Sequence, residues 1–512
     1  MFDYSDDEVS NKFITSRSRR KSGMKRRSKN RDDLREERTS AFGYANENFI
    51  SDFGLVSGEA QPRELITEAY PPARIPDNHL NVIPLFKPRP LTLHTNRRGF
   101  PPQSNVVDHP DSFFKSIKVA VQMAQLFSLL PVTGYGGPNY KSVTFRWVHW
   151  KTIYFAIYLV GNTFILFCTA LRSFSYGFTY DKSTGLVFFA SSLMASLLLL
   201  QLATNWKKVN SDFAEMEFKL YKYNYPNGIS KRFRIFTYVF MVLALVEHIL
   251  SRVAQMQREV ICSKDGSVIS VVEAFIRNYY MEVFTYISFS LWIGIVLVIL
   301  QFLCTFTWNF ADLLLGLIGW TISSRFKLFN QALFKVQGQD RDSSFWKMTR
   351  MDYNELTDLT RKVDSYIQKL MLLSLGDNLY FICIQLLKGL NSNRKSGNIY
   401  ETAYFLWSVG FLIIRTCFVT FTAAGIHDES KEAKTVLYSI PESSYCAETR
   451  RFLTQLSTND VALTGCKFFS ITRGLILTIA GTIVTYEVIL VQFNTGDEDL
   501  PADGNNTYCM NF

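Results

Sequence analysis

The chain has few charged residues where it is most apolar. Asp, Glu, Lys and Arg make up only 20% of its 512 residues, and two long segments contain none of them. One segment has 24 residues between Lys182 and Lys207, and the other has 29 between Glu282 and Asp312. About 20 apolar residues suffice to cross the hydrocarbon core of a bilayer, whereas a water-soluble domain does not need such lengths repeatedly. The missing charge therefore predicts a polytopic membrane protein.

The chain also lacks the motifs that metal sites and enzymes use. Its eight cysteines are scattered without a CxxC pair, and its six histidines are equally dispersed, which disfavours a metal centre. The sequence contains no HExxH, P-loop or GxSxG motif, and no GxGxxG after a predicted strand. We therefore expect no enzymatic activity, no cofactor and no metal ion. The cysteine spacing leaves open whether Cys262 and Cys509 form a disulfide.

Positive charge is concentrated near the N-terminus. The net charge is +10, and twelve Lys or Arg lie within residues 12–38. Such a basic run can bind nucleic acid or direct nuclear import, but beside several membrane spans a cytoplasmic tail near anionic lipid is the commoner explanation. We therefore expect membrane lipid and no nucleic acid as a partner. Residues 1–110, which are also rich in proline, are interpreted as a disordered cytoplasmic tail.

Apolar residues recur at helical spacing before the first long apolar run. They lie on one face of residues 111–130, and they are Phe113, Ile117, Val121, Ala124 and Phe127. This pattern predicts an amphipathic helix at the membrane surface, and residues 111–147 would hold this helix and a linker. Seven spans are expected to follow, at about 150–171, 184–205, 234–254, 282–326, 370–390, 402–425 and 467–493.

Lys and Arg in the loops predict the orientation of these spans. The loop 205–232 holds six of them and the segment 307–369 holds nine, whereas the loop after the first span holds Arg172 and Lys182. This asymmetry places the N-terminus in the cytoplasm and, with seven spans, the C-terminus outside. The only Asn-X-Ser/Thr sequon begins at Asn505, within the tail 494–512, and is a candidate glycosylation site.

The expected organisation has three further parts. Residues 148–425 would form a six-helix transmembrane bundle that binds the ligand. The length of the fourth span and the charge of the following segment predict helices that project into the cytosol at about 308–369. Residues 426–493 would form a cytoplasmic segment and a pore-lining seventh helix.

The most specific motif is TYEVILVQF, at 485–493, which closes the last apolar helix. It resembles the C-terminal signature of insect gustatory receptors, and the resemblance extends upstream to residue 467 and, more loosely, to HDESKEA at 427–433. The glutamate directly after Thr-Tyr, Glu487, makes this motif similar to that of the sugar-sensing branch of the family. The segment LPVTGYGG at 130–137 agrees with this interpretation.

This resemblance implies an all-α membrane protein that works as a cation channel. Four subunits would surround one pore, either as a homotetramer or as a heteromer with related gustatory receptors. The protein would reside in the plasma membrane of gustatory sensory neurons.

A polar stripe runs along the last predicted helix. Three threonines and a glutamine are spaced by four, three and seven residues, so they share a narrow arc with one isoleucine. These residues are Thr478, Thr482, Thr485, Ile489 and Gln492. Hydrogen bonding between helices is one explanation for the threonines, and a water-filled pore is the other. The glutamine at the end of the stripe favours the pore. The resemblance places Gln492 and Phe493 near the gate.

Glu487 lies on the helix face opposite this stripe. It would point into its own subunit, and together with Tyr486 it is a candidate for coupling the pore helix to the ligand-binding helices. The alternative is a protonated or snorkelling carboxyl near the outer interface.

Polar groups at membrane depth in the other spans are candidates for ligand binding. A sugar needs carboxylates or amides for its hydroxyls and an aromatic face for its C–H surface. The candidates are Glu247, His248, Tyr286, Trp292, Asp377 and Trp407. The alternative is that Arg415 with Asp377, or Glu247 with Arg252, forms a structural ion pair.

Together with these features, the resemblance implies a non-selective cation channel gated by a mono- or disaccharide, acting as a sweet-taste receptor. A receptor for another tastant, such as a bitter compound, is the alternative within the same family. A G-protein-coupled receptor would have the opposite orientation and usually carries DRY and NPxxY-type motifs, which are not found at the expected places. A transporter often shows internal repeats, and no repeat is visible here.

Overall fold

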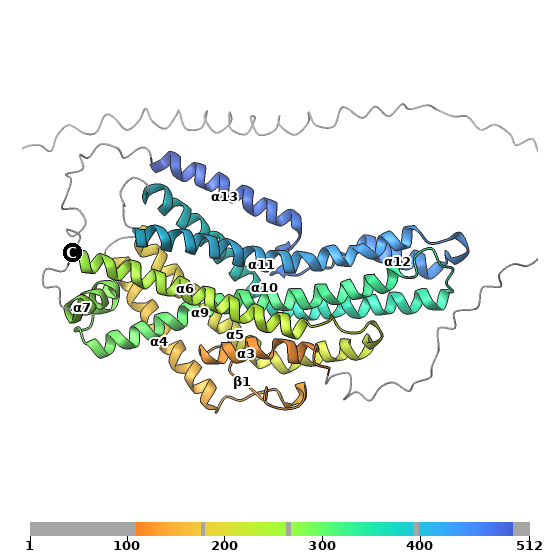
Figure 1. Cartoon of the computed structure of the whole chain (residues 1–512), viewed down its shortest axis with the longest axis horizontal. Helices are drawn as coiled ribbons and strands as arrows, with labels where there is room; N and C mark the ends of the chain where they lie inside the picture. The colour runs from red at the N-terminus through yellow and green to blue at the C-terminus, as the bar shows by residue number, and fades with distance from the viewer. Residues whose placement is uncertain (1–108, 176–179, 263–267, 393–398, 495–512) are drawn as a thin grey trace, which may run out of the picture. The chain divides into compact units, whose positions relative to one another are not determined.

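The computed structural model of the chain describes residues 109–175, 180–262, 268–392 and 399–494 (Figure 1). All of them belong to one compact unit, and most of them are helical. Six helices are long and apolar enough to cross a membrane, so the expected all-α, polytopic class is confirmed. These helices are α4 (Trp150–Ser175), α5 (Tyr180–Lys219), α6 (Ile229–Cys262), α9 (Leu291–Phe334), α10 (Ser343–Ser392) and α11 (Ile399–Tyr438).

Several helices are much longer than the apolar runs that predicted them. Helices α5, α9, α10 and α11 have 40, 44, 50 and 40 residues, whereas about 20 residues cross a bilayer core. Hydropathy marks only the part of a helix that suits lipid. The more polar continuations are helical because they pack on one another, and α9 packs against α11 along much of its length.

The expected start of the fourth span near Glu282 was wrong. Glu282 lies in the short helix α8 (Met281–Phe284), and α9 begins only after Ser290, whose backbone is extended. The uncharged run continues through the turn between the two helices. Absence of charge shows where a chain tolerates lipid, and it does not show where a helix begins.

Helix α3 (Phe113–Leu126) corrects a second expectation. Its apolar face does not lie on a membrane surface but is buried among α5, α6 and α9. Phe113 stacks on Phe213, and Phe127, just after the helix, stacks on Phe306 with ring centroids 4.1 Å apart. An amphipathic pattern records that one face avoids water. It does not distinguish a lipid surface from the core of a protein.

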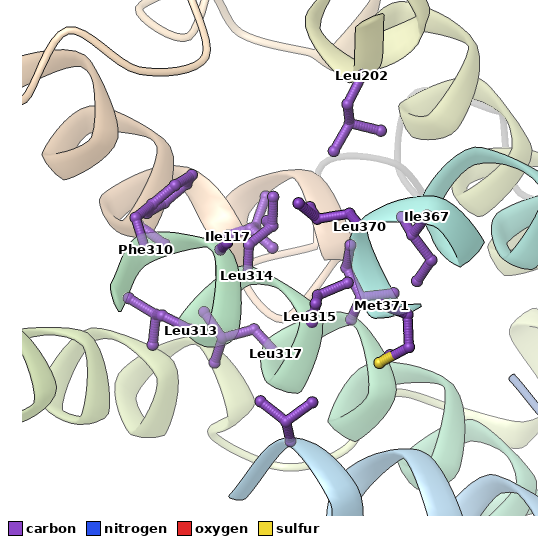
Figure 2. Close-up of a cluster of buried hydrophobic side chains, with 14 of the residues drawn as sticks. Ile117, Leu202, Phe310, Leu313, Leu314, Leu315, Leu317, Ile367, Leu370 and Met371 are labelled. Atoms are coloured by element: carbon purple, nitrogen blue, oxygen red, sulfur yellow. The ribbon is translucent and has the colours of Figure 1, made fainter. Parts of the chain in front are cut away.

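The main hydrophobic core joins α3, α5, α9 and α10 in the middle of the bundle. Figure 2 shows side chains from these helices pointing toward one another. The labelled members are Ile117, Leu202, Phe310, Leu313, Leu314, Leu315, Leu317, Ile367, Leu370 and Met371.

Short elements complete the described part of the chain. Helices α7 (Val268–Tyr279) and α12 (Ala447–Thr458) lie at opposite ends of the bundle (Figure 1). Two antiparallel ribbons pair β1 (Val132–Thr133) with β2 (Thr144–Phe145) and β3 (Thr464–Gly465) with β4 (Phe469–Ser470). The single-turn helices are η1 (Tyr140–Ser142), η2 (Tyr221–Tyr223) and η3 (Glu442–Ser444).

Helix α13 (Arg473–Asn494) follows the β3–β4 ribbon and lies at the upper edge of the bundle in Figure 1. It begins later than expected, because the chain forms a ribbon around Cys466 and Lys467, both with positive φ. The helix packs against α10 and α11, yet most of its described side chains are exposed. A count of seven spans, with α13 as the last, stays a prediction.

Candidate ligand-binding site

A cavity of about 420 Å³ lies among six helices of the bundle. Its volume falls in the range of small-molecule pockets. The lining combines aromatic rings with charged, amide and hydroxyl side chains. They are Thr184, Gly185, Phe188 and Phe189 of α5; Glu247, His248, Ser251, Arg252 and Gln255 of α6; Tyr279 of α7; Gln301, Thr305 and Trp308 of α9; Phe381, Ile384 and Gln385 of α10; and Tyr404, Phe405 and Ser408 of α11.

Glu247 supplies the carboxylate of this cavity and is only 9% exposed. The Ser408 hydroxyl donates to its Oε1 over 2.6 Å, and the Gln385 amide in turn donates to Ser408 over 2.9 Å. The other carboxylate oxygen, Oε2, is buried without a hydrogen-bond partner among the described groups. One side of the carboxylate is therefore fixed, while the other remains able to accept a hydrogen bond.

Arg252, one helical turn from His248, is held by aromatic partners. Its guanidinium donates to the Tyr279 hydroxyl over 3.0 Å and lies 4.3 Å from the centre of that ring. Within the described residues it forms no ion pair with Glu247, so that structural alternative was wrong. His248 packs edge-on against Phe302 at 5.2 Å.

Five buried polar atoms without a hydrogen-bond partner in the described part of the chain belong to residues that line this cavity. They are Glu247 Oε2, Gln301 Oε1, Gln385 Oε1, Trp308 Nε1 and Arg252 Nε. Three accept and two donate hydrogen bonds. Buried polar groups are normally paired with protein or water, so the concentration of these atoms marks the surroundings of the cavity as the most polar part of the apolar bundle.

Of the residues that the sequence proposed for ligand binding, the structure places some at the cavity and others away from it. Glu247 and His248 line the cavity. Asp377 lies beside it, in a small cavity of about 10 Å³ that also contacts Trp308.

The remaining three candidates do not line either of these cavities. Trp292 is 79% exposed and Tyr286 is also exposed. Trp407 packs partly buried against the main core. Its neighbour Ser408 lines the cavity instead, because successive helix residues point about 100° apart.

Sequence reasoning missed Gln301, Gln385 and Trp308. Gln301 and Trp308 both lie in the 29-residue uncharged segment, and Gln385 lies near the end of the fifth apolar run. The signal that the sequence offered for the glutamines was an amide side chain within an otherwise apolar helix. Neither glutamine was singled out, because hydropathy does not reveal which face of a helix meets a cavity.

Next to the cavity residue Trp308, Arg415 pairs with Asp312 and not with Asp377. The two side chains are 1% and 2% exposed, and Nε lies 2.7 Å from Oδ2. Arg415 also donates to the amide oxygens of Asn309 and Asn378 over 2.7 and 2.9 Å. Ser374 and Asn378 donate to Asp312. This network joins α9, α10 and α11 in the interior of the bundle.

The polar stripe of α13 is exposed within the subunit. The hydroxyls of Thr478, Thr482 and Thr485 donate to carbonyl oxygens four residues earlier in the same helix, over 3.2, 2.9 and 2.9 Å. Tyr486 and Ile489 are also exposed, as is Gln492.

Three residues named for the pore helix and the tail fall outside this description. The side chains of Glu487 and Phe493, and the whole of Asn505, lie outside the described residues. The roles expected for them stay predictions.

The fold matches that of solved insect receptors. The chain is similar to the insect olfactory receptor OR5 from Machilis hrabei in complex with eugenol, with a TM-score of 0.50 and 11% sequence identity. The match covers 74% of this chain and 98% of that receptor. A second structure of OR5 from Machilis hrabei gives the same TM-score. At this identity the likeness concerns the fold alone.

Sequence comparison gives the family. The family model for the trehalose receptor matches residues 96–501. Gustatory receptor 5a for trehalose from Drosophila melanogaster is 31% identical over 390 residues, covering 75% of this chain and 86% of that protein. Gustatory receptor for sugar taste 64f, from the same fly, is 29% identical over 400 residues, covering 76% and 82%. The chain therefore belongs to the trehalose receptor family, and the resemblance expected from its C-terminal motif is confirmed.

Proposed function

We propose that this protein is a sugar receptor whose cavity binds a mono- or disaccharide and thereby opens a cation-conducting pore. The observation that carries the proposal is the set of five unpaired polar atoms around the aromatic-lined cavity. Relatives named as receptors for trehalose and for sugar taste support the ligand class.

The physical match is between the cavity wall and a polyol. Each hydroxyl of a sugar donates one hydrogen bond and accepts others, and the wall offers both kinds of partner. An unpaired buried polar group costs roughly 1–3 kcal/mol, so a ligand that pairs several of them is favoured over an apolar one. The rings of Phe188, Phe381 and Tyr404 provide faces for the C–H surface of the sugar.

The proposed sugar site centres on Glu247 and His248, with Asp377 in the adjoining cavity. To the residues predicted from the sequence it adds Gln301, Gln385 and Trp308, each of which has one buried polar atom without a partner among the described residues. Ligand contacts by Tyr286, Trp292 and Trp407 stay predictions from the sequence.

The pore is proposed to form where four copies of α13 meet. The exposure of both the polar stripe and the apolar residues of α13 supports this arrangement, because an isolated subunit leaves the helix largely uncovered. Thr478, Thr482, Thr485 and Ile489 would line the pore. Gln492 and Phe493 would form its gate, with Tyr486 and Glu487 coupling it to the bundle. The four subunits are either identical or shared with related gustatory receptors.

The remaining assignments concern placement in the cell. In this proposal the protein lies in the plasma membrane of gustatory neurons. Its N-terminus and a helical extension lie in the cytoplasm, and its C-terminus lies outside and carries a glycan at Asn505. The asymmetry of Lys and Arg between the loops supports this orientation. Membrane lipid is a further expected partner.

Recordings from cells that express this chain alone test the proposal. Trehalose, maltose, sucrose and glucose are applied in turn, with a panel of bitter compounds in parallel. At least one sugar should evoke a cation current that is absent from untransfected cells. A current evoked by bitter compounds and by none of the sugars would identify a different tastant class. Surface expression without any ligand-evoked current would contradict a receptor that works alone.

A further inference from the structure

A small hydrophobic cluster lies apart from the main core and touches both the cavity and α13. Its buried members are Phe381 and Ile382 of α10 and Leu412 of α11. Trp308 packs against the cluster from the cavity side, and Ile483 packs against it from α13. The same few side chains therefore contact the candidate ligand site and the candidate pore helix.

Two aromatic rings form the side of this cluster that faces the cavity. Trp308 and Phe381 both line the cavity, and their ring centroids lie 4.8 Å apart in an edge-to-face arrangement. The Arg415 guanidinium covers the Trp308 ring, with its central carbon 4.1 Å from the ring centre. Arg415 is itself held by Asp312, so the Trp308 ring rests against a buried ion pair.

In the described part of the chain, this cluster is one of the points at which α13 is attached to the bundle. An ion pair of 2.5 Å joins Arg473, at the start of α13, to Asp428 of α11. Ile483 lies ten residues further along, while Leu477 between them and Val484 beside it are exposed. A displacement of the cluster therefore reaches the middle of α13 directly.

We propose that the Phe381–Ile382–Leu412 cluster transmits occupancy of the cavity to α13 through Ile483, with Trp308 as its ligand-facing contact. This inference rests on the proposed function of the cavity and adds the residues that couple it to the pore. A ligand changes a conformational equilibrium only through contacts that differ between the two states. Packed side chains that touch both sites provide such a contact. Leu412 and Ile483 are positioning residues, since they pack behind Phe381 and do not themselves line the cavity.

The test compares neighbouring residues on the same helix. Leu412 is 2% exposed and belongs to the cluster, whereas Ile413 is 44% exposed and does not. Leu412→Ala and Ile413→Ala therefore make a matched pair. Ile483→Ala is the second variant, since truncation on a largely exposed helix leaves the bundle core intact. Each full-length receptor is assayed for trehalose-evoked current, for resting current without sugar, and for the shift in thermal stability that trehalose produces in detergent.

Leu412→Ala and Ile483→Ala should change the ratio of trehalose-evoked to resting current by roughly 2- to 30-fold, the range of residues on a coupling network. The thermal shift by trehalose, which reports binding, should stay at the wild-type value. Ile413→Ala should match wild type in all three measurements. Combining Leu412→Ala with Ile483→Ala should give less than the sum of the two effects, because both break one path.

Two failures can be told apart. A wild-type receptor that neither binds nor responds to any sugar overturns the proposed function, while resting currents of the variants still test the cluster. A wild-type receptor that responds, with Leu412→Ala and Ile483→Ala both indistinguishable from Ile413→Ala, overturns the coupling role. Loss of the thermal shift in Leu412→Ala and Ile483→Ala would also overturn it, because both would then act on binding.

Discussion

Single polar atoms define the cavity more sharply than its shape does. Ser408 satisfies one oxygen of Glu247, and the second oxygen is left for an occupant. Gln301 and Gln385 each contribute another unpaired acceptor. Membrane helices place polar groups at depth only at a cost, so several such groups around one space suit the polar ligand proposed for it.

Glu247 is the residue whose change should affect ligand sensitivity most. Glu247→Ala should raise the trehalose concentration for half-maximal current by roughly tenfold to a hundredfold, because a ligand hydroxyl loses its buried acceptor. Glu247→Gln keeps one acceptor and should lose less. The measurement is the dose–response curve of whole-cell current, with surface expression checked for each variant.

Trp292→Ala serves as the comparison for Glu247→Ala. The sequence proposed Trp292 for ligand binding as well, yet it is 79% exposed and lines no part of the cavity. Its dose–response curve should therefore stay at the wild-type position. Equal losses in the two variants would mean that the sugar does not bind in this cavity.

Among the elements, α13 differs from the other long apolar helices. It meets the body of the subunit at Arg473, at Ile483 and along parts of α10 and α11, and much of its remaining surface is uncovered. The threonine hydroxyls bond within their own helix, so they do not require a partner helix. Both features suit a helix that lines water on one side.

Cysteine substitution along α13 tests which of its faces meets water. Cysteines at positions 478, 482 and 485 should react with a small water-soluble thiol reagent during sugar application, and the reaction should block current. A cysteine at position 483 should react much more slowly, because Ile483 packs on the cluster. The unsubstituted chain controls for its own cysteines. Equal rates at all four positions would show that the threonine stripe does not line the pore.

For the whole molecule, the described helices divide their polar and apolar parts along the long axis of the bundle. The polar ends of α9, α10 and α11 gather with α12 at one end of the bundle, and α7 lies at the other (Figure 1). The end that holds α12 also carries most of the loop Lys and Arg. It is therefore the end expected in the cytoplasm.

Epitope labelling tests this orientation. A tag at the C-terminus should be accessible to antibody in intact cells, and a tag at residue 20 should become accessible only after permeabilisation. The reason is the excess of Lys and Arg in cytoplasmic loops together with seven crossings. The reverse labelling pattern would contradict the topology, and C-terminal inaccessibility alone would show that α13 does not cross the membrane.

The sequence by itself determined the membrane class, the approximate position of the long helices and the family. These properties depend on local information. A run without charge tolerates lipid wherever it lies, and the motif around Thr485 and Gln492 identifies the family without reference to contacts. Sequence reasoning failed where local pattern is ambiguous, as for α3, whose apolar face suits either lipid or protein.

Only the tertiary structure decided which polar groups meet. The sequence alone offers more than one carboxyl group in the apolar spans as a partner for Arg415. In the structure, the rotation of α9 pairs it with Asp312. The same rotation turns Gln301 and Trp308 toward Glu247 and leaves Trp292 exposed. Each residue along a helix turns the facing direction by about 100°. The partners of a membrane polar group are therefore set by the relative rotation and offset of whole helices, which the packing of all their side chains determines together.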